Sequence, residues 1–361
     1  MHLGDVRWPT DPLIVDATAR AIANGHTGYC PPPGIEELRT AIATDVGRKR
    51  GVPYSAANVS VQPGGKPVIG KFLSSVLNDG DEVLCPRPGY PIYESQVNYL
   101  GGIVRPYRYA PADGGFVLDL DSLRAAITPH TRVLILNDCH NPTGACCSPA
   151  SLDEIASLAI KHDLWVLSDE AYGEMRFDGS FDSIVSRTGM AQRTTILYTF
   201  SKRFAMTGWR LGAAIGPPEI IRSINSLNIN AESCTTHFVQ RAMAECLGRE
   251  LSEPTRLLRE LDRRRHSLVA ALNEIPDIHV QLPPATFYLF VDFSRVLSRL
   301  KCRTTDEFMR IALRETGVSF CTASHFAQTH NDDGAFVRFA YGVLQEDELA
   351  AAVDSLRRLT G

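Results

Sequence analysis

Lys202 is the residue whose surroundings most clearly suggest chemistry. It follows an apolar stretch, residues 195–200, that is typical of a buried strand, and the hydroxyl groups of Thr199 and Ser201 are close to it in the sequence. Burying an ammonium group costs several kcal/mol unless it is paired or neutralised, and Schiff-base chemistry requires a desolvated lysine with a lowered pKa. A lysine after a strand is more commonly a solvated loop residue, so the choice between these two interpretations depends on the other residues of the chain.

Polar side chains also follow other predicted strands. Asp169 and Tyr172 come directly after an apolar strand, and Asn141 lies in a turn after another. Gly64 and Gly65 precede a helix whose first amides would attract an anion such as a phosphate. Ligands of open α/β sheets gather at the carboxyl ends of the strands, so we expect these groups to share one crevice. Together they suit a pyridine cofactor that carries a phosphate.

The elements that must position these residues alternate along the chain. Near-continuous apolar strands and amphipathic helices predict a largely parallel sheet covered on both faces, followed by a smaller α+β region after a long charged helix at 254–273. The strands predicted for the sheet are 59–61, 81–85, 103–107, 132–137, 164–168 and 195–200. Those predicted for the smaller region are 279–281, 287–292, 318–321 and 336–340. Helical patterns also fill 219–247.

Composition excludes several classes of function. The 361 residues carry a net charge of -4 and offer no basic face for nucleic acid. The nine cysteines include no Cys-x-x-Cys pair, so we expect reduced, mostly buried thiols and no zinc site. The sequence has neither a signal segment nor an apolar run of membrane-spanning length. We therefore expect a soluble cytoplasmic protein with no nucleic-acid or membrane partner.

A nucleotide hydrolase is a competing interpretation. Residues 65–72 nearly fit the phosphate-binding loop of such enzymes, and 164–170 resembles the acidic strand that accompanies it. However, Phe72 stands where a hydroxyl must bind Mg²⁺, and 67–69 is too stiff and apolar to wrap a phosphate. A ligand-sensing regulator on the same fold would need an added DNA-binding domain, for which we expect no room. Both alternatives are disfavoured.

The chain resembles the class I/II aminotransferases, pyridoxal-phosphate enzymes of fold type I. The resemblance covers nearly the whole chain and is carried by motifs in the family's order, namely Tyr29 followed by Gly34-Ile-Glu-Glu-Leu-Arg39, Pro86-Arg-Pro-Gly-Tyr-Pro-Ile-Tyr93, Asn141-Pro-Thr-Gly144, Ser168-Asp-Glu-Ala-Tyr172, Ser201-Lys202 with Gly208-Trp-Arg-Leu-Gly212, and Val337-Arg338-Phe339. It implies an α/β fold in which a large cofactor-binding domain, residues 26–250, holds a mostly parallel seven-stranded sheet covered by helices on both faces. Residues 1–25 and 251–361 would form the smaller α+β domain.

The resemblance implies a catalytic role for three residues. Lys202 would form the Schiff base with pyridoxal 5'-phosphate and shuttle a proton during the reaction. Asp169 would pair with the protonated pyridine nitrogen and keep the ring an electron sink. Tyr172, together with Asn141, would donate hydrogen bonds to the 3'-oxygen of the cofactor.

Further residues would hold the cofactor and the substrate. Tyr90 and Ala171 would pack on the two faces of the ring. Arg338 would clamp the substrate α-carboxylate with a bidentate fork, near Gly4 and Asn141. The phosphate would be bound by Gly64, Gly65, Lys66, Thr199 and Arg210, and by Tyr29 from the neighbouring subunit of a homodimer.

The sequence departs from the family near its start and leaves the reaction open. Arg7 and Trp8 replace more usual residues, as His140 does before Asn141; these three side chains either line an unusual substrate pocket or simply pack. The predicted reaction moves the amino group of an L-amino acid to a 2-oxo acid, and Lys66 suggests a dicarboxylate such as aspartate or glutamate. The alternative is another pyridoxal-phosphate reaction on the same scaffold: β/γ-elimination, decarboxylation or a biosynthetic cyclisation.

Overall fold

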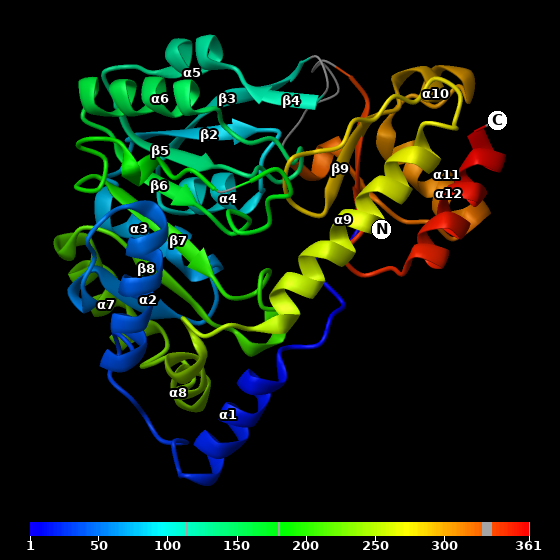
Figure 1. Cartoon of the computed structure of the whole chain (residues 1–361). Helices are drawn as coiled ribbons and strands as arrows, with labels where there is room; N and C mark the ends of the chain where they lie inside the picture. Colours follow the sequence, from blue (N-terminus) through cyan, green and yellow to red (C-terminus); the bar gives the residue numbers. More distant parts are fainter. Residues whose placement is uncertain (113–114, 180, 327–333, 361) are drawn as a thin grey trace.

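A large mixed sheet forms the centre of the molecule. The computed structural model describes residues 1–112, 115–179, 181–326 and 334–360, and within these ranges the sheet has eight strands in the order β1-β8-β7-β6-β5-β2-β3-β4 (Figure 1). The strands are β1 (Val59–Gln62), β2 (Glu82–Arg87), β3 (Ile103–Ala112), β4 (Gly115–Leu118), β5 (Thr131–Asn137), β6 (Trp165–Asp169), β7 (Thr194–Thr199) and β8 (Gly212–Ile215). The predicted α/β fold is confirmed, with one strand more than the seven predicted.

The strand directions bring the strand ends that carry the predicted site residues to one edge of the large sheet. The strands β3, β2, β5, β6 and β7 pair in parallel, and β8 runs antiparallel between β7 and β1. Consequently β1 runs in the same direction as β7. Asn137 pairs with Asp169, and Asp169 pairs with Leu197, so the last residues of β5 and β6 lie side by side.

Helices cover both faces of the large sheet, because successive strand residues point to opposite sides. Val133 and Ile135 of β5 face one core, whereas Leu134 and Leu136 face the other. The first core is closed by α3 (Lys66–Val76), α4 (Ile92–Tyr99) and α7 (Pro218–Ala231). The second is closed by α2 (Glu36–Arg50), α5 (Leu120–Ala126), α6 (Pro149–Lys161) and α8 (His237–Cys246), with α1 (Pro12–Ala23) packed on α8.

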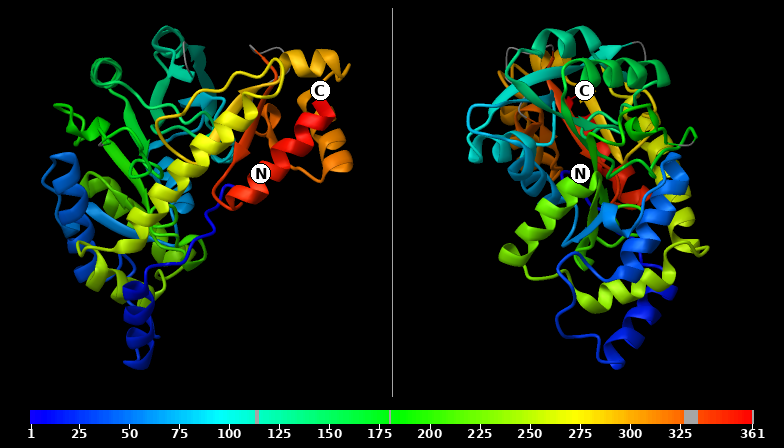
Figure 2. Two further views of the ribbon diagram at one scale, coloured as in Figure 1. Left: turned by 45° about the vertical axis from the view of Figure 1, so that its right-hand side comes forward. Right: turned by 90° about the vertical axis from the view of Figure 1, so that its left-hand side faces the viewer.

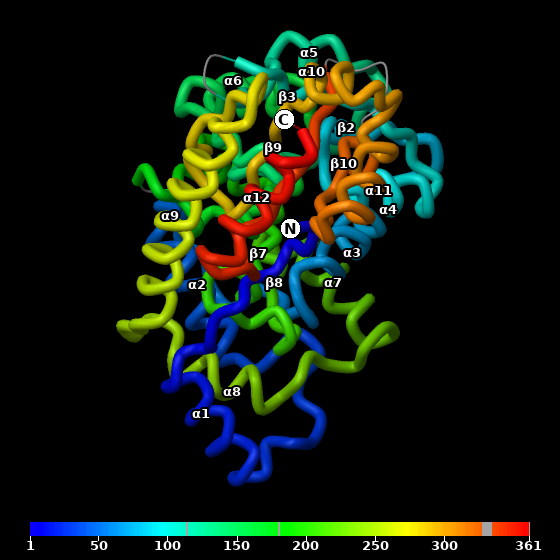
Figure 3. Tube along the Cα trace, turned by 90° about the vertical axis from the view of Figure 1, so that its right-hand side faces the viewer, coloured from blue at the N-terminus to red at the C-terminus, as the bar shows by residue number. Residues whose placement is uncertain are grey.

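A second, smaller sheet lies beside the large one. Among the described residues it has the antiparallel order β10-β11-β9, formed by β10 (Cys321–Thr322), β11 (Phe336–Ala340) and β9 (Tyr288–Asp292). Around it lie α10 (Ser294–Arg299), α11 (Thr305–Thr316) and α12 (Glu346–Thr360) (Figure 3). The long helix α9 (Ser252–Leu272) runs from the side of the large sheet to the small one (Figure 1). The division of the chain at 25/26 and 250/251 stays a prediction.

The first residues of the chain join the small sheet to the rest of the molecule. The amide of Ala340 donates to the carbonyl of Met1 at 2.8 Å, and the amide of Arg7 donates to the carbonyl of Gly342 at 3.0 Å. From there the chain runs down to α1 (Figure 2). Gly4 is thereby held between the two sheets. None of the helices in the described ranges has both the length and the apolar character needed to cross a membrane.

Several elements differ from the sequence-based prediction. The short strands β4 and β8 were not predicted, because four residues show too little periodicity, and those of β8 are mostly small. The helical pattern at 219–247 is broken after α7, where Ser233 has a φ of 62°. The strand predicted at 279–281 is wrong: in the described structure the side chain of Asn273 makes both backbone hydrogen bonds of Val280.

Candidate active site

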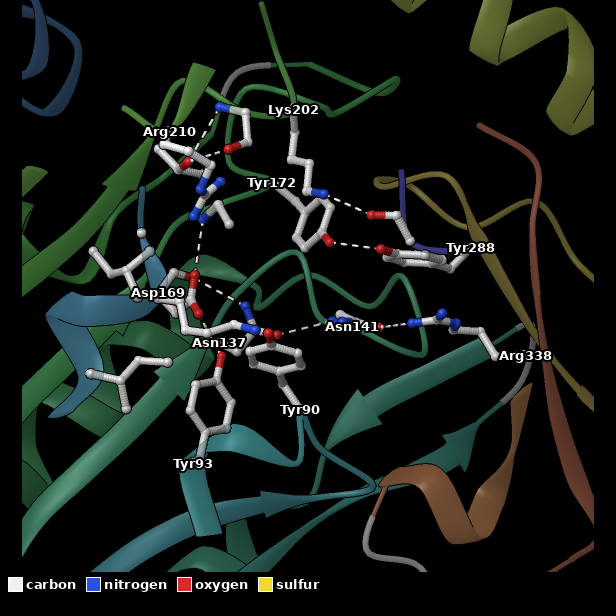
Figure 4. A pocket seen from close by; sticks show the side chains of 18 residues that line it. Tyr90, Tyr93, Asn137, Asn141, Asp169, Tyr172, Lys202, Arg210, Tyr288 and Arg338 are labelled. Atoms are coloured by element: carbon white, nitrogen blue, oxygen red, sulfur yellow. Dashed lines mark hydrogen bonds between the residues drawn. The ribbon is translucent and has the colours of Figure 1, made fainter. Parts of the chain in front are cut away.

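A cavity of about 600 Å³ opens at the carboxyl ends of the central strands of the large sheet (Figure 4). The strands β5, β6 and β7 supply its floor, and β9 and β11 of the small sheet supply Tyr288 and Arg338 on its far side. The cavity therefore lies between the two sheets. Of the predicted site residues, those that line it are Gly4, Gly65, Lys66, Tyr90, Asn141, Asp169, Ala171, Tyr172, Thr199, Lys202, Arg210 and Arg338.

Lys202 projects into this cavity from the turn that follows β7. Its Nζ donates a hydrogen bond to the carbonyl oxygen of Gly4 at 2.7 Å. Burial lowers the pKa of Lys202 to about 8, against the opposing effect of the nearby Asp5 carboxylate, while the positive charge of Arg338 lowers it further. About a tenth of the amine is therefore neutral, and nucleophilic, at pH 7.

Asp169 is a buried carboxylate at the end of β6. Tyr93 donates its hydroxyl to Oδ2 at 2.6 Å, and the amide of Ala171 donates to Oδ1 at 3.1 Å. Burial nevertheless raises the pKa of Asp169 to about 6. No cation pairs with this carboxylate among the described residues, so it is suited to a positively charged ligand group. Tyr93 was not among the predicted site residues, although it ends one of the motifs.

An anion site lies where β1 meets α3. Gly64 has a φ of 93°, and a Cβ atom there would lie 2.1 Å from Nη2 of Arg210. Nη2 donates to the carbonyl of Pro63 at 3.2 Å, which holds the guanidinium beside the glycine turn. Thr199 Oγ1 donates to Ser201 Oγ at 2.9 Å in the wall of the cavity. A guanidinium, two hydroxyls and the first amides of a helix are an arrangement typical of phosphate binding.

A chain of hydrogen bonds links the ends of β5 and β6 to Arg338. Asn137 donates its Nδ2 to the carbonyl of Asp169 at 3.1 Å and accepts from the amide of Asn141 at 3.0 Å. Asn141 Oδ1 then accepts from Arg338 Nη1 at 2.9 Å (Figure 4). The Nη2 atom of Arg338 donates to the carbonyl of His2 at 2.8 Å, and its Nε is buried with no hydrogen-bond partner among the residues that the structure describes.

Two phenols face Lys202 across the cavity. The hydroxyls of Tyr172 and Tyr288 are hydrogen-bonded at 2.7 Å, and burial raises the pKa of Tyr172 well above its usual value. Both phenols therefore keep their protons and remain able to donate. The guanidinium of Arg338 lies 4.2 Å from the ring centroid of Tyr288, which fixes the arginine from one side.

Several of the candidate residues do not line the cavity, among them Gly64, Tyr29, His140 and Trp8. Gly64 lies just behind Arg210, and Tyr29 is 88% exposed on the surface of this chain. His140 is buried and stacks on Tyr109 with 3.7 Å between ring centroids, and Trp8 donates its indole to Glu253 at 2.9 Å. These two contacts favour packing over a role in a substrate pocket. The residues that line the cavity but were missed are Ile69, Tyr93, Asn137, Leu197, Ser201 and Tyr288.

Comparison with known proteins identifies the family. Residues 3–356 match the profile of aminotransferase class I and II. The aspartate/prephenate aminotransferase of Thermus thermophilus is 32% identical over 362 residues, which is 99% of this chain and 90% of that protein. The aromatic aminotransferase structure from Pyrococcus horikoshii superposes with a TM-score of 0.92 at 32% identity, covering 99% of this chain and 94% of the other. The N-succinyldiaminopimelate aminotransferase structure from Mycobacterium tuberculosis gives the same score and identity, with 99% and 92% covered.

The chain therefore belongs to the class I/II aminotransferases, and it is a pyridoxal-phosphate-dependent aminotransferase. The donor set in the cavity fits this cofactor on three separate grounds. A buried lysine amine can bond to its aldehyde, an unpaired buried carboxylate suits its protonated ring nitrogen, and the cradle at Gly64 has no room for a Cβ atom. The geometry and the family thus agree on the ligand.

Proposed function

We propose that this protein moves the amino group of an L-amino acid to a 2-oxo acid, with pyridoxal phosphate held covalently by Lys202. The observation that carries the proposal is the meeting of the buried Lys202 amine, the buried Asp169 carboxylate and the Arg338 guanidinium in one cavity. The first two groups suit the cofactor, and the third suits a substrate carboxylate.

Residues on the floor of the cavity would hold the cofactor. Asp169 would face the ring nitrogen, with its carboxylate oriented by Tyr93 and by the amide of Ala171. Tyr172 and Asn141 would donate to the 3'-oxygen, and Tyr90 and Ala171 would pack on the ring faces. The proposed phosphate ligands are Gly64, Gly65, the backbone amide of Lys66, Thr199, Arg210 and the Tyr29 of a neighbouring subunit. When bound, the cofactor supplies an electron sink for the electron pair left at the substrate Cα.

The α-carboxylate of the amino acid would be bound at the end of the cavity that contains Arg338. Arg338 would bind the α-carboxylate through its guanidinium, which Asn141 and Tyr288 hold in place. The backbone of Gly4 lies close enough to Tyr288 and Arg338 that a Cβ atom there would lie 2.6 Å from the tyrosine hydroxyl. This close approach keeps the α-carboxylate end of the cavity narrow.

The other end of the cavity suggests a dicarboxylate. Lys66 lines the cavity and is exposed, so its ammonium is available to a distal carboxylate. Relatives named as aspartate/prephenate and aspartate aminotransferases support aspartate or glutamate as a substrate. We propose that one of the two is the amino donor.

Lys202 would also move the proton. Its Nζ has a pKa of about 8, so near neutral pH the neutral amine is available to take a proton from the substrate Cα. Tyr172 stays protonated, so it positions the ligand and does not transfer the proton.

We also propose that the protein is a cytoplasmic homodimer and that each chain forms two domains, divided at 25/26 and 250/251.

The test follows the cofactor spectrum of purified holoenzyme while a panel of L-amino acids is added. Conversion to the amino form of the cofactor, with release of the matching 2-oxo acid, is the expected result, and aspartate or glutamate should convert fastest. Lys202→Ala should lose both the covalent chromophore and the conversion, whereas Lys66→Ala should keep the chromophore and raise KM for dicarboxylates only. Release of ammonia or CO₂ without conversion of the cofactor to its amino form would contradict transamination.

A further inference from the structure

The loop between β5 and α6, residues 138–148, carries Asn141 and also a pair of cysteine side chains that the proposed reaction does not use. The Sγ atoms of Cys139 and Cys146 are 3.3 Å apart, and the thiol of Cys146 is the donor of this contact. Cys139 is fully buried, and Cys146 is partly exposed. A buried thiol in contact with a more accessible one is the arrangement of a thiol pair that oxidises to a disulfide.

The backbone already holds these two residues in register. His140 and Ala145 are joined by a hydrogen bond from the amide of His140 to the carbonyl of Ala145 at 2.8 Å, so Cys139 and Cys146 stand opposite each other one step further out. Asp138 closes the base of the loop, since its Oδ1 accepts from the amides of both Cys139 and Cys147 at 2.9 and 2.8 Å. The two sulfurs are thus brought together by the loop itself, without movement of other elements.

Charges of both signs lie near the pair. Burial raises the pKa of Cys139 well above its usual value, the contact with Cys146 and the carboxylate of Asp138 raise it further, and of the described residues only Arg176 opposes them. Arg176 lies near both sulfurs. Its pKa is raised mainly by its hydrogen bonds to Asp178, and Cys146 and Cys139 raise it further. A guanidinium stabilises a thiolate and repels a metal ion. A carboxylate oxygen of Asp138 lies within 4.8 Å of both sulfurs, so a metal site is the alternative that the test has to separate. The Oδ2 atom of Asp138 is buried, and it has no hydrogen-bond partner in the described part of the chain.

We propose that Cys139 and Cys146 form a reversible disulfide when the protein meets hydrogen peroxide. The thiolate of Cys146 attacks the peroxide; an S–O bond forms, the O–O bond breaks, and the leaving oxygen takes up a proton as water. Cys139 then loses its proton and attacks the Cys146 sulfur; the S–S bond forms, the S–O bond breaks, and a second water leaves. The two thiols give up two electrons and the peroxide accepts them.

The disulfide alters substrate binding, a step that rests on the proposed function. Bonding shortens the separation of the sulfurs from 3.3 Å to about 2.0 Å at the base of the loop that positions Asn141. Asn141 holds Arg338 through the 2.9 Å hydrogen bond to Nη1 (Figure 4). The bond pulls on Cys139, two residues before Asn141, so the hydrogen bond that holds Arg338 is displaced with the loop. Because a misplacement of about 1 Å can lower catalytic efficiency by up to about a hundredfold, kcat/KM for the amino acid should fall by about tenfold to hundredfold in the oxidised enzyme, through a rise in KM.

The experiment treats holoenzyme with a slight excess of hydrogen peroxide, alkylates the remaining thiols and maps peptides by mass spectrometry. The tryptic peptide 133–161 contains Cys139, Cys146 and Cys147. It should lose two hydrogens and carry one alkyl group, and dithiothreitol should restore three alkyl groups. Cys147→Ala is the matched control and should still form the bond, whereas Cys139→Ser and Cys146→Ser should each abolish it. Because Cys146 is partly exposed, Cys146→Ser should do so with unchanged melting temperature.

Two readouts keep this proposal separate from the proposed function. Formation of the bond is read by mass and does not depend on transamination, and the rise in KM should disappear in Cys146→Ser. Three alkylated cysteines after peroxide, a bond that requires Cys147, or one equivalent of added Zn²⁺ held tightly by the reduced protein would each overturn the disulfide. A disulfide that leaves KM unchanged would overturn the link to Asn141.

Discussion

Burial sets the chemistry of the two ionisable residues that face the cofactor site. It lowers the pKa of Lys202 to about 8 and raises that of Asp169 to about 6, because in both cases the charged form loses its hydration. The lysine thereby becomes more nucleophilic, while the carboxylate gains most from a positively charged partner. A ligand that offers an aldehyde to the first and a protonated nitrogen to the second relieves both costs.

The pKa of Lys202 predicts how fast the cofactor attaches to cofactor-free protein. Only the neutral amine attacks the aldehyde, and its fraction rises with pH up to the pKa, so the rate constant should increase about tenfold per pH unit and level off above about 8. Stopped-flow absorbance at different pH values measures it. Asp5→Asn removes a charge that raises this pKa, so its inflection should lie at lower pH. An inflection near 10 would show that the amine is not desolvated.

Asp169→Asn tests the partner of the ring nitrogen. Removing one member of a buried charge pair costs about 3–5 kcal/mol, so the amino-acid half-reaction should slow by about a hundredfold to five-thousandfold. Tyr93→Phe is the comparison: it removes the 2.6 Å hydrogen bond but leaves the carboxylate, and it should slow the reaction by about tenfold. Single-turnover spectra record both. Equal losses in the two variants would assign the effect to the hydrogen bond rather than to the charge.

At the scale of elements, the large sheet places these residues through strand ends that are easily recognised in the sequence. The apolar runs of β5, β6 and β7 identify buried parallel strands, and the polar residue that follows each must then reach the same edge. Asp169, Asn141 and Lys202 could be predicted in this way. Ser201 and Asn137 were missed because a serine beside the lysine and an asparagine inside a strand read as ordinary structural residues.

The turn between β1 and α3 is the element whose shape depends on glycine. Gly64→Ala places a Cβ atom 2.1 Å from Arg210 Nη2 at a φ of 93°. The guanidinium must move away from the anion site, and losing a charge-assisted hydrogen bond costs about 1.5–3 kcal/mol, so the cofactor Kd should rise by about tenfold to hundredfold. Titration of cofactor-free protein with pyridoxal phosphate measures the change.

Gly51→Ala separates this effect from backbone strain alone. Gly51 ends α2 with a φ of 68°, and no atom of the described residues lies within 4 Å of the position its Cβ would take. This variant should lose about 1–2 kcal/mol of unfolding free energy and keep the cofactor Kd of the native protein. Equal loss of cofactor affinity in both variants would mean that general destabilisation, not the Arg210 clash, weakens binding.

At the scale of the whole molecule, the cavity depends on segments far apart in the sequence. Gly4 comes from the first residues, Lys202 from the large sheet, and Tyr288 and Arg338 from the small sheet. Arg338 and Gly4 could be assigned only through the family resemblance, because no local pattern indicates that β11 and the start of the chain meet. Tyr288 was missed for the same reason: its partner Tyr172 lies 116 residues away. The sequence pattern specifies single elements better than their long-range contacts.

Tyr29 provides the last prediction, because one chain does not bring it to its own cavity. It is 88% exposed, and apolar side chains of α1 near it in sequence, Leu13, Val15 and Ile22, are also exposed, as expected if this face is covered in a homodimer. Co-expression of Tyr29→Ala and Lys202→Ala chains, each with a different affinity tag, yields mixed dimers that can be purified through both tags. One site of each mixed dimer then has Lys202 from one chain and Tyr29 from the other, so it should show about half the native activity. Each variant alone should be nearly inactive at limiting cofactor. If Tyr29 served its own subunit, the mixed dimer would contain no native site and would stay as inactive as its parents.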